Sequence, residues 1–211
     1  MSSPVSLSLS VADTTAAARR LMAYDRQLAG PPESLTVAGD PDATSIEAAL
    51  AQGRRLRARW DDGSHLSVYP DEGMVKASFT LKPTSAPEAL ALLDTIDFQL
   101  AVFAELYPEW NEQEYAGTGF GDGHYAHGWA CAFRGAGHER LVSRRWLDHG
   151  PWLVHRGKND TTLVQFHDLA ADARTALAQA APGHQRMGFS DTGGFLHHPH
   201  TYHHDHANEK R

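Results

Sequence analysis

Apolar and polar residues alternate along residues 54–81, and this alternation constrains the fold more than any other feature of the sequence. A period of two residues places apolar side chains on one face of a strand and polar side chains on the other. The run is interrupted by Asp61-Asp62-Gly63 and by Pro70-Asp71-Glu72-Gly73, whose residue types favour tight turns. The stretch therefore predicts three antiparallel strands joined in sequence order as a meander.

Two further strands and a helix are predicted before this meander. Residues 5–11 alternate apolar residues with serine, which predicts a half-buried strand, and residues 34–38 predict a short one. Asp13 or Thr14 is suited to cap a helix that runs to Gly30, because both side chains can accept a hydrogen bond from the first helical turn.

Two more helices are predicted on either side of the meander. Thr44 or Ser45 is expected to cap a short one. The longest is expected from Pro83 to about Tyr107, where apolar residues recur at intervals of three and four. The residues of this apolar stripe are Leu90, Leu93, Ile96, Leu100, Phe103 and Leu106.

Residues 124–181 are predicted to repeat the same plan. They contain four strand-like segments separated by three turn sequences, followed by a helix that is capped by Asp168 and stopped by Pro182. The predicted class is α+β: an antiparallel sheet built from two meander-plus-helix segments, about 54–107 and 124–181, with helices packed mainly on one face. Residues 1–196 are expected to form one domain, followed by a flexible, histidine-rich tail over residues 197–211.

Charge and hydropathy narrow the class of function. The chain has 211 residues and a net charge of −7, and nucleic-acid binding is not expected because phosphate neutralisation requires clustered Lys and Arg. Residues 1–120 carry nine Lys and Arg against seventeen Asp and Glu, whereas residues 121–211 carry ten against nine. No leader peptide and no run of roughly 18 apolar residues is visible. We therefore expect a cytoplasmic protein with no membrane partner.

Cys131 is the single cysteine of the chain, which is typical of a protein from a reducing compartment. A lone cysteine is most often a small apolar core residue. Catalysis by its thiol would require a histidine from a neighbouring strand, such as His155 or His167. We assign no catalytic residue from the sequence.

Histidines suggest two places for a metal ion. The tail is expected to bind Zn²⁺ or Ni²⁺, since clustered imidazoles are good ligands for both ions. Its histidines are His197, His198, His200, His203, His204 and His206. A second, internal set comprises His124, His127 and His167, but their spacing does not match a known ligand pattern.

Aromatic, acidic and arginine residues between Glu109 and Trp152 suggest a binding surface. The candidate residues are Trp110, Glu112, Glu114, Tyr115, Trp129, Arg134, Arg144, Trp146 and Trp152. They favour a non-catalytic soluble protein, of the inhibitor or immunity type, that recognises a basic protein partner or a small ligand. The alternative is a metal-dependent enzyme or a metal-binding carrier that uses the C-terminal histidines.

Overall fold

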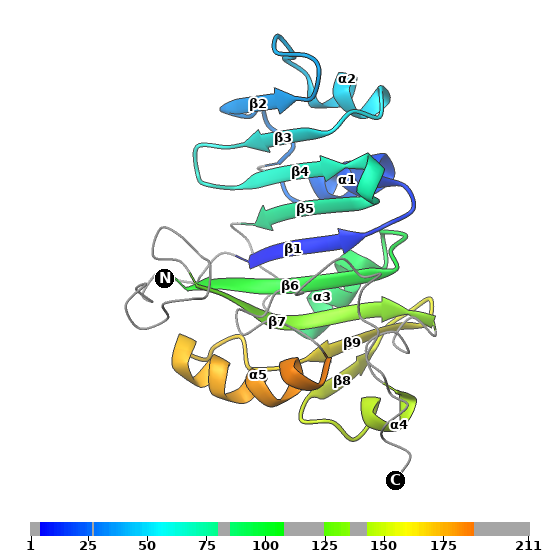
Figure 1. The fold of residues 1–211 in the computed structure, drawn as a ribbon, viewed down its shortest axis with the longest axis vertical. Coiled ribbons are helices and arrows are strands. Elements are labelled where there is room, and N and C mark those ends of the chain that lie inside the picture. Colours follow the sequence, from blue (N-terminus) through cyan, green and yellow to red (C-terminus); the bar gives the residue numbers. More distant parts are fainter. Residues whose placement is uncertain (1–4, 27, 80–84, 108–124, 136–142, 188–211) are drawn as a thin grey trace. The chain divides into compact units, whose positions relative to one another are not determined.

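A computed structural model describes residues 5–26, 28–79, 85–107, 125–135 and 143–187 (Figure 1). These residues form nine strands and five α-helices, so the predicted α+β class with an antiparallel sheet is confirmed. The chain divides into two compact units, Ser2–Ala101 and Val102–Arg211. The prediction of one domain over residues 1–196 stays a prediction. Within the described ranges, no helix combines the length and the apolar character needed to cross a bilayer.

The N-terminal unit contains a five-stranded antiparallel sheet in the order β2-β3-β4-β5-β1. Its strands are β1 (Val5–Ser10), β2 (Ser34–Val37), β3 (Leu56–Arg59), β4 (His65–Tyr69) and β5 (Met74–Phe79). The meander over β3, β4 and β5 is confirmed, with a 3₁₀ turn (Pro70–Glu72) in the second connection. Gly73 ends that turn at φ +58°, a conformation that glycine adopts without steric cost.

Strand register gives this sheet one apolar and one polar face. Leu56 lies opposite Val68, and Val68 opposite Val75, and all three side chains are buried. Burial of each such side chain contributes about 1.5–3 kcal/mol, so this face is the core of the unit. The next residue along each strand belongs to the other face, where Arg57 and Lys76 are exposed.

Two helices of the N-terminal unit begin at the predicted caps. Asp13 Oδ1 accepts a hydrogen bond from the backbone N–H of Ala16 at 2.9 Å and begins α1 (Thr14–Tyr24), which packs against β4 and β5. Ser45 Oγ accepts one from Ala48 at 3.3 Å and begins α2 (Ile46–Ala51), which packs against β3. Helix α1 ends before the predicted Gly30.

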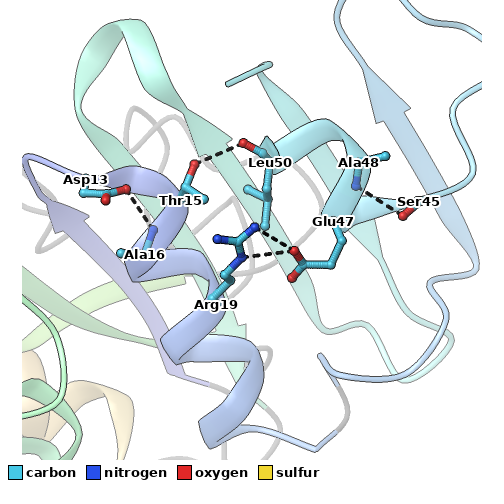
Figure 2. Close-up of polar contacts among 8 residues, drawn as sticks. All are labelled: Asp13, Thr15, Ala16, Arg19, Ser45, Glu47, Ala48 and Leu50. Carbon is cyan, nitrogen blue, oxygen red and sulfur yellow. Dashed lines mark hydrogen bonds and ion pairs between the residues drawn. The ribbon is translucent and has the colours of Figure 1, made fainter. Parts of the chain in front are cut away.

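Polar contacts join α1 to α2 (Figure 2). Nε and one terminal nitrogen of Arg19 both lie within 3.0 Å of Oε2 of Glu47, and the Thr15 hydroxyl donates to the carbonyl oxygen of Leu50. The ion pair is exposed, so it contributes at most about 1 kcal/mol. Together with the Thr15 hydrogen bond, it links the two helices.

The predicted long helix over residues 83–107 is wrong in its second half. Helix α3 spans Ala86–Leu93, and residues 100–107 form strand β6 (Leu100–Tyr107). Ala101, Val102 and Phe103 are all buried. A strand buried on both faces is a continuous apolar run, and the spacing of such a run also fits a helix. That ambiguity explains the error.

The C-terminal unit departs from the predicted four-strand meander. Its described strands include β7 (Tyr125–Arg134), β8 (Leu153–Arg156) and β9 (Thr161–Gln165), and β9 lies between the other two. One of the four segments predicted as strands instead contains the short helix α4 (Arg144–Leu147). The predicted turn between β8 and β9 is confirmed, with Asn159 and Asp160 at positive φ, which these two residue types tolerate better than most.

The last helix starts and ends later than predicted. Helix α5 (Ala173–Met187) packs against β7 and begins after Asp172, whose carboxylate accepts the N–H of Thr175 at 2.8 Å. Asp168 is not its cap, because the backbone N–H of Asp168 instead donates to Oε1 of Gln179 within the helix. The helix continues through Pro182, although proline removes one helical hydrogen bond.

Candidate functional site

Many of the sequence-predicted site residues lie outside the described ranges. These are Trp110, Glu112, Glu114 and Tyr115 of the acidic loop, His124, and the six tail histidines. The side chains of His127 in β7 and of Arg144 in α4 also lie outside the described part. Their proposed roles in binding a partner or a metal ion therefore stay predictions.

Cys131 and Trp129 belong to the core of the C-terminal unit. Both side chains are fully buried in β7, and burial raises the pKa of the Cys131 thiol far above its ordinary value. A thiol that stays protonated at neutral pH is a poor nucleophile. The Trp129 ring packs edge-on against Phe103 with centroids 5.7 Å apart. Neither side chain reaches the protein surface.

Two arginines of the C-terminal unit engage neighbouring side chains. Arg156 forms an ion pair with Asp148 at 2.8 Å and donates to the hydroxyl of Thr162. Arg134 donates to the hydroxyl of Thr161 at 3.3 Å. These contacts join β9 to the strands on both sides of it and leave the two guanidinium groups less available for an anionic ligand.

Trp146 of α4 is covered by arginines. The guanidinium carbon of Arg186, from α5, lies 4.3 Å from the centroid of the Trp146 ring, and that of Arg145 lies 5.9 Å away. Both distances are within the range of cation–π attraction. Trp146 thus fastens α4 to α5.

A cleft of about 310 Å³ lies where β8, the end of β9 and α5 meet. It contains two residues that the sequence identifies as candidates, Trp152 and His167. The cleft is lined by Pro151, Trp152, Leu153, Gln165, Phe166, His167, Asp168 and Gln179. Leu153 is 58% exposed at its rim, the largest exposure among large apolar side chains in the described part of the chain. We name this feature the Trp152–His167 cleft.

Glycines allow the aromatic wall of this cleft to pack closely. The Trp152 indole N–H donates to the carbonyl oxygen of Leu147 at 2.6 Å, and its ring meets Phe166 edge-on at 6.5 Å. A Cβ at Gly150 would lie 1.9 Å from the Trp152 ring, and one at Gly183 would lie 2.7 Å from Phe166. Both distances are far below van der Waals contact, so glycine is required at each position.

A chain of hydrogen bonds forms the polar wall. Nε2 of His155 donates to Oε1 of Gln165 at 3.0 Å, and Nε2 of Gln165 donates to the carbonyl oxygen of His167 at 3.0 Å. His167 is buried, and its Nδ1 lies 2.9 Å from the carbonyl oxygen of Asp168. A carbonyl oxygen only accepts, so Nδ1 of His167 carries a proton. This network holds the cleft in one shape.

Asp168 gives the Trp152–His167 cleft its charge. It is exposed, and Arg and Lys are absent from the residues that line the cleft. Its backbone N–H is held by Gln179 at 3.1 Å, which fixes the chain at the cleft rim. The arrangement joins aromatic rings, amide groups and one carboxylate.

A larger hollow, of about 440 Å³, lies between α1 and α2 in the N-terminal unit. Its two charged residues, Arg19 and Glu47, neutralise each other across it (Figure 2). The remaining lining is mostly small or apolar. This hollow offers a ligand less chemistry than the Trp152–His167 cleft.

Within the described ranges, no three His, Cys, Asp or Glu side chains come together as potential metal ligands. His167 therefore belongs to no such group among the described residues. No protein-family model, no curated protein and no solved structure matches this chain.

Proposed function

We propose that this chain is a non-catalytic binding protein that receives an arginine or lysine side chain of a basic protein partner in the Trp152–His167 cleft. The observation that carries the proposal is the pairing of an aromatic wall with a single carboxylate, Asp168, where Arg and Lys are absent from the lining. A cation beside an aromatic ring gains about 0.5–2 kcal/mol. A carboxylate adds a charge-assisted hydrogen bond.

The order of the lining supports this proposal. Trp152, Gln165 and His167 are each held by a hydrogen bond of 3.0 Å or less. A preformed site loses little conformational entropy on binding, so more of the contact energy appears as affinity. Such a surface suits an inhibitor or an immunity-type protein for a basic toxin, and the net charge of −7 favours the approach of a basic partner.

Binding of a labelled peptide that alternates Gly and Arg tests the proposal. We expect Asp168→Asn to weaken binding about fivefold to tenfold, because the one carboxylate of the cleft is lost. The matched control is Asp160→Asn, which removes another exposed carboxylate, from the β8–β9 turn. Equal affinities of the two variants would contradict the proposal.

A further inference from the structure

The polar face of the N-terminal sheet carries a group of positive charges that the described structure does not neutralise. Arg57 and Arg59 follow each other on one face of β3, and Lys76 lies on the same face of β5. All three side chains are exposed. Within the described ranges, none of the three forms an ion pair, whereas the neighbouring Arg55 pairs with Asp71 and Glu72.

Register shows that this face contains cations and hydroxyl groups without a carboxylate. One row across the sheet reads Thr36, Arg57, Ser67, Lys76 and Ser8. The next row reads Ser34, Arg59, His65, Ser78 and Ser6. Ser67 is buried, and the side chain of Ser78 lies outside the described part. The groups that the two rows present to a ligand are therefore the three cations, His65 and the hydroxyl groups of Ser6, Ser8, Ser34 and Thr36. We call these two rows the basic face.

The basic face stands out against the rest of its unit. The N-terminal unit, Ser2–Ala101, carries nine basic and thirteen acidic residues, so the unit is acidic as a whole although this face is basic. Arg57 and Arg59 are separated by roughly 6.6 Å along the strand, and Lys76 lies two strands, or roughly 9.6 Å, from Arg57. Like charges at such distances repel, which costs folding stability, and a bound anion would remove that cost.

His65 reports the electrostatic potential at this face. Its pKa is lowered first by burial and then by the positive charges of Arg57, Arg59 and Lys76. The imidazole of His65 is therefore neutral at pH 7. No described carboxylate offsets the effect of these three cations on its pKa.

We infer that the basic face binds an acidic polypeptide segment in an extended conformation, independently of the Trp152–His167 cleft. Side chains on one side of an extended chain repeat about every 6.6–7 Å, which matches the spacing of Arg57 and Arg59. The exposed hydroxyl groups of Ser34 and Thr36, on the strand next to the two arginines, are placed to donate to further carboxylate oxygens.

Nucleic acid fits this face less well. Single-stranded nucleic acids bind on exposed aromatic rings, and Tyr69 is the one aromatic residue at this end of β4. Its ring is already covered by Arg55, 4.9 Å from the centroid, and by Lys76 at 6.0 Å. The net charge of −7 also repels a long polyanion.

Fluorescence polarisation with a short labelled peptide that alternates Glu and Thr tests the inference. We expect the triple variant R57Q/R59Q/K76Q to bind at least about tenfold more weakly than the parent protein, since three charge-assisted contacts are lost. The control R20Q/R26Q/R174Q makes the same change in net charge at exposed arginines elsewhere. Equal weakening in both variants would overturn the inference, because it would show only an effect of net charge.

His65 provides a readout that loss of folding does not imitate. In the folded parent protein, the NMR titration of His65 should move to higher pH when the Glu-Thr peptide binds, because added carboxylates favour the protonated imidazole. An unchanged titration at saturating peptide would place the peptide elsewhere and overturn the inference. A thermal unfolding transition of the triple variant close to that of the parent shows that its affinity is measured on folded protein.

Other occupants give different results in the same assay. A labelled oligo-dT that binds more tightly than the peptide and competes with it would make the face a nucleic-acid surface and overturn the inference. Sedimentation of the parent protein as a dimer, with a monomeric triple variant, would assign the face to a second copy of this chain and also overturn it. A monomeric parent that binds the peptide supports it.

Discussion

Gly150 shows how one residue position determines the shape of the Trp152–His167 cleft. The backbone there lies so close to the Trp152 ring that a single methyl group would overlap it. The ring is in turn held by the carbonyl oxygen of Leu147 and by Phe166. A cleft wall that is fixed at three points has little room to adjust.

Gly150→Ala is therefore expected to destabilise the protein by about 1–3 kcal/mol, the usual cost of an overpacked side chain. Chemical unfolding measures the loss of unfolding free energy that Gly150→Ala causes in the parent protein and in a Trp152→Leu background. Removal of the ring should reduce the cost of Gly150→Ala, because the clash then has no partner. If the two changes were additive, the close contact with Trp152 would not be the cause.

His65 predicts a pH dependence of stability. Its pKa in the folded state is below the ordinary value of 6.5, so the unfolded chain binds the proton more tightly. The free energy of unfolding should therefore decrease as the pH falls below about 6.5. Above about pH 6.5 the imidazole is neutral in both states, and His65 causes no loss of stability there.

Thermal unfolding of the parent protein and of His65→Gln at pH 7.5 and pH 5.5 measures how much stability His65 costs on acidification. Other titrating groups affect both proteins alike, so the difference between the two proteins isolates His65. We expect the parent to lose more stability than the variant on acidification. An equal loss in both proteins would show that His65 titrates normally in the folded state.

Helix α5 illustrates an element whose limits depend on tertiary contacts. Asp172 caps it through hydrogen bonds from the backbone N–H and the hydroxyl of Thr175, and these bonds lower the pKa of Asp172. Asp168, the cap expected from the sequence, lies outside the helix and is tied to Gln179. The two aspartates therefore have different roles although they are four residues apart.

Asp172→Ala is accordingly expected to lower the melting temperature of the protein more than Asp168→Ala does, because only the first change removes a helix cap. The comparison is made at neutral pH, where the lowered pKa keeps the Asp172 carboxylate ionised. A larger loss in Asp168→Ala would show that the cap lies at the position predicted from the sequence.

The elements differ in how well the sequence predicts them. Strands β3 to β5 follow from alternation and two turns, because each has one buried and one exposed face. Strand β6 was mistaken for helix because residues 101–103 are buried on both faces. The pairing of β9 with both β7 and β8 depends on contacts between distant residues, which local patterns do not contain.

The cleft was predictable only in part for the same reason. Trp152 and His167 stand out by residue type, and both line it. Gln165 and Gln179 were missed, since glutamine is common in sequences and fourteen positions separate the two. Only the fold brings them together. Gly150 was a usable signal, because a glycine next to a strand can mark a close approach of the backbone to a neighbouring group.

At the scale of the whole molecule, each unit carries one surface that we propose as a binding site, and the two surfaces differ in charge. The Trp152–His167 cleft contains a carboxylate beside aromatic rings, and the basic face contains three cations among hydroxyl groups. We propose that a basic partner docks at the first and an acidic segment at the second. The opposite chemistry of the two probes allows each proposal to fail without the other.

The most direct test of the proposed function is an NMR titration of the labelled protein with the Gly-Arg peptide. We predict saturable shifts of the indole N–H of Trp152 and of the side-chain amides of Gln165 and Gln179, which all belong to the cleft. These shifts should be much smaller in Asp168→Asn. Saturable shifts of the same size in Asp168→Asn, or shifts confined to residues outside the cleft, would contradict the proposed function.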